Sequence, residues 1–168
     1  MADVRDLPDQ GFAGDDGSPD PDLVQALAAY DADPESRYDA TLVRLQTARL
    51  LVPVVAVLGE AEVDERGLAR DKTSDMATVL VQGQDGRTAL LAFTGTEALR
   101  LWNPQARPVP VPVARAAQAA LQDGAAALVV DLAGPVMFVV GAEDLRELAE
   151  GNLLVELNGR FGWATPGR

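Results

Sequence analysis

Apolar and polar residues alternate in blocks along this chain, and the blocks predict a series of short strands and helices. The clearest series lies between residues 74 and 112. Two runs rich in apolar and β-branched residues, 79–82 and 88–93, flank the sequence Gly-Gln-Asp-Gly. A short spacer that contains two glycines is typical of a hairpin loop. The pattern therefore predicts two antiparallel strands joined at residues 83–86.

The second of these strands leads directly into a predicted helix. Residues 89–93 are apolar at every position, as expected of a strand that is covered on both faces. Thr94 follows, and Glu97 comes three residues later, which is the spacing of a capping box at a helix start. Apolar residues at helical spacing should then place Trp102 against the sheet. Pro104 ends the predicted helix, because proline has no backbone donor.

Helix and strand patterns continue along the rest of the chain. Helices are predicted at 23–30, 34–48, 114–122 and 143–150, and strands at 50–58, 126–132 and 136–140. Three prolines alternate with valines at 108–113, so this extended segment lacks ladder donors and belongs at a sheet edge or in a crossing connection. The charged residues 59–73 predict an excursion or a loosely ordered hairpin.

The two ends of the chain differ from this central region. Residues 1–19 are rich in Asp, Gly and Pro and hold few large apolar side chains, a composition that predicts disorder. Residues 151–168 carry several leucines and aromatic residues around Asn158-Gly159, which is the pattern of a short hairpin. The folded domain is therefore expected at 20–150, between an acidic disordered segment and an apolar tail. That tail either folds back on the domain or contributes to an interface.

The charge of the chain limits the classes of partner. The net charge is −12, and residues 1–39 alone carry eleven acids and two arginines. Phosphate binding needs a concentrated basic face, so the sequence disfavours nucleic acid. The longest uncharged apolar run, 50–58, has nine residues, whereas a membrane helix needs about 20. The acidic N-terminal sequence has no apolar signal region, so the expected location is the cytoplasm.

The residue inventory also narrows the possible chemistry. The chain contains neither histidine nor cysteine. Ser-His-Asp and Cys-His catalytic sites, disulfides and the commonest zinc ligand are therefore excluded. No other motif for catalysis or for metal binding stands out. The sequence therefore favours a protein that is not an enzyme, and it predicts no cofactor and no metal.

Two hypotheses for function follow, and the sequence leaves both open. In the first, the chain is a binding or regulatory module that presents a sheet edge, a loop or its apolar tail to a protein partner or to a second copy. The tail residues of that interface would be Phe161 and Trp163. In the second, the chain binds a small molecule or acts as an enzyme with four polar residues in one cleft: Asp85, Arg87, Arg107 and Asp131. Convergence of these four would favour the second hypothesis, and an exposed apolar patch would favour the first.

A series of short motifs occurs in a fixed order along the chain. They are Lys72-Thr-Ser-Asp-Met-Ala, Asp85-Gly86-Arg87, Phe93-Thr-Gly-Thr-Glu-Ala-Leu, Trp102, Ala106-Arg-Pro-Val-Pro-Val and Asp131-Leu-Ala-Gly-Pro-Val. This series resembles the SseB N-terminal-domain family, in its actinobacterial form. The resemblance covers about residues 23–150 and implies an α+β fold in which a compact mixed β-sheet is flanked by helices. The resemblance implies no catalytic residues for this chain.

Overall fold

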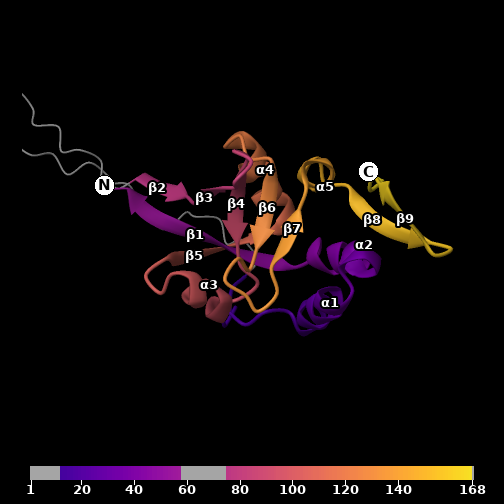
Figure 1. The fold of residues 1–168 in the computed structure, drawn as a ribbon, viewed down its shortest axis with the longest axis horizontal. Helices are drawn as coiled ribbons and strands as arrows, with labels where there is room; N and C mark the ends of the chain where they lie inside the picture. The colour runs from indigo at the N-terminus through magenta and orange to yellow at the C-terminus, as the bar shows by residue number, and fades with distance from the viewer. Residues whose placement is uncertain (1–11, 58–74, 168) are drawn as a thin grey trace, which may run out of the picture.

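The computed structural model describes residues 12–57 and 75–167, and within them the chain forms five helices and nine strands. The order is two helices, a run of strands interrupted by three further helices, and a final hairpin (Figure 1). This confirms the predicted α+β class. The strands divide between a four-stranded sheet, a three-stranded sheet and the hairpin. The excursion predicted at 59–73 lies outside the described residues.

The first two helices begin in the same way. Helix α1 (Pro21–Ala32) and helix α2 (Pro34–Leu45) each start at a proline that follows an aspartate. The Asp20 carboxylate accepts a hydrogen bond from the backbone N–H of Asp22 at 2.8 Å, and Asp33 caps α2 in the same manner. Both helices bury leucines against the core. Helix α2 ends three residues before the predicted limit, because the chain turns there into the first strand.

The four-stranded sheet is the centre of the fold. Its strands, in spatial order, are β3 (Leu80–Gln82), β4 (Thr88–Ala92), β6 (Ala127–Val130) and β7 (Phe138–Val140). Strands β3 and β4 pair in antiparallel register across the predicted 83–86 turn, so the hairpin is confirmed. Strands β4 and β6 are parallel, and their carboxyl ends therefore lie at the same edge of the sheet.

The second sheet contains β1 (Arg49–Val57), β2 (Asp75–Thr78) and β5 (Arg107–Pro112), with β1 in the middle. The alternating proline segment is strand β5, an edge strand of this sheet, as its missing donors require. The two sheets meet where the backbone groups of Leu51 and Phe93 exchange two hydrogen bonds of 2.8 Å.

Helix α3 (Thr96–Trp102) starts later than predicted, and the predicted capping box is wrong. The residue that caps the helix is Gly95, which has no side chain to bond the first turn. The Thr94 hydroxyl instead donates to the carboxylate of Asp131 at 2.7 Å. Trp102 is half-buried, and its ring lies 5.6 Å from that of Phe93.

Alternate residues of the central sheet enter two different cores. One side, with Leu90, Leu128 and Phe138, packs against α1, α2, helix α4 (Val113–Gln122) and helix α5 (Ala142–Ala149). The other side, with Leu91 and Phe93, packs against α3 and β1. The first core is the larger of the two, so the two faces of the sheet are unequally covered.

The predicted C-terminal hairpin is confirmed as β8 (Leu153–Leu157) and β9 (Arg160–Ala164), seen at one end of the molecule in Figure 1. Asn158 and Gly159 in its turn both have positive φ, as a tight hairpin turn requires. The hairpin is attached to α2 through Gln46. The Gln46 side-chain amide bonds both backbone groups of Leu154, at 2.8 and 2.9 Å.

Candidate functional site

The four polar residues predicted to share one cleft lie in three separate places. Asp85 and Arg87 are in the turn before β4, whereas Asp131 follows β6 at the opposite end of the parallel pair. The length of β4 separates these ends by about 15 Å. Arg107 is the first residue of β5 and pairs with Val54 of β1 in the three-stranded sheet. The cleft of the second hypothesis is therefore not formed.

Asp85 and Arg87 form an ion pair with each other. The Arg87 Nε lies 2.6 Å from an Asp85 carboxylate oxygen, and the Arg87 backbone N–H donates to the other oxygen at 3.0 Å. These hydrogen bonds hold the pKa of the Asp85 carboxyl below its ordinary value. Both side chains are exposed, so the pair shapes the hairpin turn at the surface.

Phe161 and Trp163, the predicted interface residues of the tail, are half-buried. Both pack against the larger core, and Trp163 lies opposite the buried Leu154 in the hairpin register. The apolar side chains that the hairpin leaves exposed are Leu153 and Leu157. The tail is therefore folded back on the domain through its aromatic residues.

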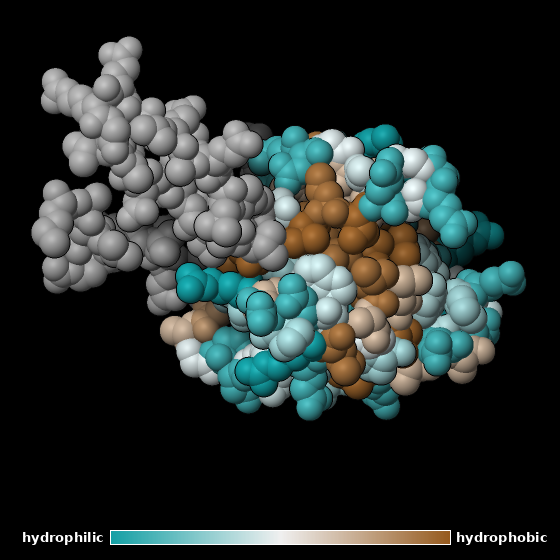
Figure 2. Space-filling view, turned by 60° about the vertical axis from the view of Figure 1, so that its left-hand side comes forward, coloured by the Kyte–Doolittle hydropathy of each residue, from teal (hydrophilic) through white to brown (hydrophobic). Residues whose placement is uncertain are grey.

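A groove of about 510 Å³ lies on the less covered face of the central sheet. We call it the sheet-face groove. Figure 2 shows a continuous patch of apolar residues on the face of the molecule that is in view. The floor of the groove is formed by side chains that share one face of the sheet: Val81, Ala89, Ala127, Val129 and Val139. Leu132 and Met137 line one end, and the Asp85–Arg87 turn lines the other.

A second hollow, of about 380 Å³, lies at the carboxyl ends of β4 and β6. We call it the strand-end cavity. Its walls come from α1, from the start of α3 and from the segment between β6 and β7: Val24, Leu27, Ala28, Gly95, Ala98, Pro135 and Val136. Thr94, Glu97, Asp131 and Pro19 complete the lining. The carboxyl edge of parallel strands is a common position for ligand sites in open sheets.

Asp131 is the most buried charged group at this cavity, with 1% of its surface exposed. Its two carboxylate oxygens accept hydrogen bonds from the Thr94 backbone N–H at 2.8 Å and from the Thr94 hydroxyl at 2.7 Å. Burial raises the pKa of the Asp131 carboxyl above its ordinary value, although the two bonds from Thr94 act in the opposite direction. The backbone of Asp131 has φ of 54°, a left-handed conformation that few residues adopt.

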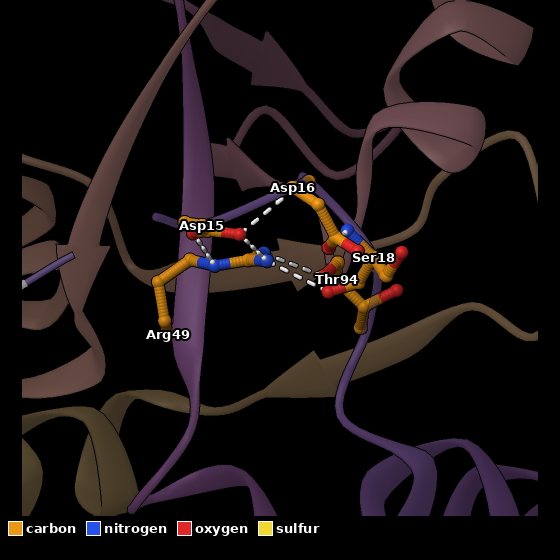
Figure 3. A network of polar contacts seen from close by, with 6 residues as sticks. Asp15, Asp16, Ser18, Arg49 and Thr94 are labelled. Atoms are coloured by element: carbon orange, nitrogen blue, oxygen red, sulfur yellow. Dashed lines mark hydrogen bonds and ion pairs between the residues drawn. The ribbon is translucent and has the colours of Figure 1, made fainter. Parts of the chain in front are cut away.

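The segment 12–19, which we call the N-terminal strap, lies against this end of the fold (Figure 3). Arg49 of β1 holds it. The guanidinium pairs with the Asp15 carboxylate at 2.6 and 2.7 Å, and it also donates to the backbone oxygens of Ser18 at 2.7 Å and Thr94 at 2.8 Å. The disorder predicted for 1–19 therefore does not apply to the strap. Residues 1–11 lie outside the described residues.

The strap approaches the start of α3 closely because two glycines face each other there. A Cβ atom at Gly95 would lie 2.8 Å from Cδ of Pro19 and 3.0 Å from the backbone oxygen of Gly17. The Gly17 oxygen in turn accepts a hydrogen bond of 2.8 Å from the backbone N–H of Thr96. Through these contacts the strap brings Pro19 into the wall of the strand-end cavity.

Replacing Arg49 by alanine is expected to release the strap. The arginine makes four polar contacts in a partly buried position, so the free energy of unfolding should fall by about 1–2 kcal/mol. Amide hydrogen exchange at Thr96 should become faster, because its N–H loses the Gly17 oxygen. The control is Arg44→Ala, an exposed arginine of α2. Wild-type exchange at Thr96 in the Arg49→Ala variant would contradict this description of the strap.

Metal-binding clusters and membrane-spanning helices are both absent from residues 12–57 and 75–167. No group of three or more acidic residues in this part of the chain is arranged to hold a metal ion. None of the helices described for it has the length and apolar character needed to cross a membrane.

The comparisons with known proteins give a family. The family described as the SseB protein N-terminal domain matches residues 23–147. The chain belongs to the SseB family. Neither the curated proteins nor the solved structures contain a match to it. The resemblance of the short motifs to the SseB family is thus confirmed, and the actinobacterial form stays a prediction.

The SseB match runs from α1 to α5. All residues that line the sheet-face groove fall inside it, and so does every residue of the strand-end cavity except Pro19. The strap and the C-terminal hairpin lie outside the matched range. Both hollows are therefore built from the SseB domain, and the strap adds one wall residue.

The sequence indicates Asp131 as a candidate site residue but does not indicate which residues surround it. The sequence predicts Thr94 as a helix cap, because its spacing to Glu97 fits that role. Its actual partner is 37 residues away in the chain. Nothing in the sequence points to Arg49, because the strap that it binds has the composition of a disordered segment.

Proposed function

We propose that this SseB domain is a non-enzymatic protein-binding module whose sheet-face groove holds an amphipathic helix of a basic partner protein. The observation that carries the proposal is the exposure of large apolar side chains around the groove. Val139 is 39% exposed and Met137 is 49% exposed. Exposed apolar side chains that adjoin one another typically mark an interaction surface.

The shape of the floor favours a helix as the occupant. Ala89 and Ala127 pair in one row across the sheet beside Val81, and the larger Val129 and Val139 pair in the next row. This arrangement leaves a shallow trough across the sheet. Helices are the usual layer that covers a sheet face, and on the opposite face four helices of this chain do so.

The charge of the chain favours a basic partner over a second copy. Two copies that each carry a net charge of −12, of which residues 1–39 contribute −9, repel each other, whereas a basic helix is attracted to the acidic molecule. Near the groove, Glu143 is exposed in the first turn of α5, directly after the lining residue Ala142. The charge of Arg87 is already compensated by Asp85.

The proposal can be tested with two synthetic peptides of identical leucine and lysine content. In one peptide the leucines form a single helical face, and in the other their order is scrambled. The full chain should bind the amphipathic peptide more tightly in isothermal titration calorimetry. Val139→Glu should weaken that binding at least about tenfold, the loss expected when a central apolar contact is removed. Leu101→Glu, at a 65% exposed position on α3, should leave it unchanged.

The two glutamate variants add the same negative charge, so they separate apolar contact from attraction. A basic peptide held only by charge would bind Val139→Glu and the wild type with equal affinity. Such a peptide would also bind equally tightly in its amphipathic and its scrambled order. Either result would overturn the proposal. Concentration-dependent self-association that Val139→Glu abolishes, seen by analytical ultracentrifugation, would assign the groove to a second copy instead.

A further inference from the structure

We infer that the strand-end cavity is a second binding site, which takes a small apolar amine. The cavity shares no lining residue with the sheet-face groove, so the inference does not depend on the proposed protein partner. It rests on the size of the cavity, on the apolar character of its walls and on the charges that line it.

The size and the walls fit a compact apolar molecule. A volume of about 380 Å³ falls within the range of about 300–1,000 Å³ that small-molecule sites occupy. Val24 and Leu27 of α1, Ala98 of α3 and Val136 provide apolar surface on several sides. Val24 is 45% exposed, so its side chain offers apolar surface to a ligand in the cavity.

The charges at the cavity select the head group of the ligand. Asp131 and Glu97 contribute carboxyl groups, and no lysine or arginine is among the residues described as its lining. Each Asp131 oxygen accepts one hydrogen bond from Thr94, and a carboxylate oxygen can accept two. An ammonium group would therefore find both a free lone pair and an opposite charge, whereas an anionic ligand would meet two like charges.

The raised pKa of Asp131 supports this choice. The upward shift of this pKa means that the Thr94 hydrogen bonds do not fully compensate the loss of water around the carboxylate. A cation beside the carboxylate would supply the missing compensation. Arg49 contributes a cation to the strap network, but its guanidinium is engaged by Asp15, Ser18 and the Thr94 backbone oxygen.

Three probes that share one apolar body test the inference: adamantylamine, adamantanol and adamantane carboxylate. The full chain is titrated with each, and binding is followed by NMR chemical shifts. The amine should bind at least about tenfold more tightly than the alcohol, and the carboxylate should not bind. In the Asp131→Asn variant, the amine should lose this preference over the alcohol.

A cavity-filling variant shows whether binding occurs in this hollow. Ala28→Phe places a large side chain in the cavity wall and should abolish amine binding. Ala28 is exposed on α1, so the fold should accept the change. Ala32→Phe, at an exposed position of the same helix outside the cavity, should bind like the wild type. The inference is overturned if the alcohol binds as tightly as the amine, if Ala28→Phe keeps binding, or if no probe binds. Val139→Glu should not affect the amine in any case.

Discussion

Replacing Asp131 by alanine is expected to lower the free energy of unfolding by about 3 kcal/mol. The change removes the acceptor of both the backbone N–H and the hydroxyl of Thr94, and each buried donor left without a partner costs about 1–3 kcal/mol. Alanine must also adopt φ of 54°, which costs roughly a further 1–2 kcal/mol. Loss of the desolvated charge offsets part of this total. Urea unfolding measures the change.

Asp131→Asn is the matched control, because it removes only the charge. The asparagine oxygen can accept from the Thr94 N–H, its NH₂ can donate to the hydroxyl, and asparagine tolerates positive φ. This variant should be at least as stable as the wild type at neutral pH. If the alanine and asparagine variants unfold alike, the Thr94 hydrogen bonds do not stabilise the fold.

The same pair of proteins gives a pH dependence with a defined sign. Burial raises the pKa of Asp131 above 3.8, so the folded state holds this proton more tightly than the unfolded chain. The contribution of Asp131 to stability is therefore greatest below pH 3.8 and is lost as the pH rises through the folded-state pKa. Relative to the wild type, Asp131→Asn should gain stability across that window. A constant difference between the two proteins would contradict the shift.

Removing residues 152–168 is expected to destabilise the domain by about 3 kcal/mol. The truncation exposes the apolar surface of the domain that Leu154, Phe161 and Trp163 cover. Burial of one leucine and two half-buried aromatic side chains outweighs the entropy gained by freeing a short hairpin. The melting temperature should fall by about 10 °C, and an apolar dye should bind.

The truncation also separates the two roles considered for the tail. The truncated chain should still bind the amphipathic peptide, because the hairpin contributes no residue to the sheet-face groove. Gln46→Ala, which removes the side chain that bonds Leu154, should produce part of the loss of stability with the hairpin still present. An unchanged melting temperature together with lost peptide binding would make the tail the interface.

Features encoded by neighbouring residues could be predicted from the sequence. The hairpins at 83–86 and at Asn158-Gly159 follow from local turn chemistry, and the edge position of β5 follows from its prolines. The starts of α1 and α2 are visible as an aspartate before a proline. Each of these signals lies within a few residues, so no tertiary contact is needed to interpret it.

The candidate sites depend on contacts between distant segments and could not be predicted. Asp131 and Thr94 are 37 residues apart, and Arg49 is 34 residues from Asp15. The apolar run at 89–93 correctly predicts a strand between two layers, but it does not show where the outer layer stops. Leu91 is fully buried by α3 and β1, whereas Val139, two strands further along the same face, is left exposed.

We propose that the sheet-face groove is the protein-binding surface, and a methyl chemical-shift map can locate the bound peptide on the chain. The full chain, labelled at its valine, leucine and methionine methyl groups, is titrated with the amphipathic leucine–lysine peptide. We expect the largest shifts at Val129, Met137 and Val139, with little change at Leu101 and Leu157. Shifts concentrated on Leu153 and Leu157 of the hairpin, with the groove methyl groups unchanged, would contradict it.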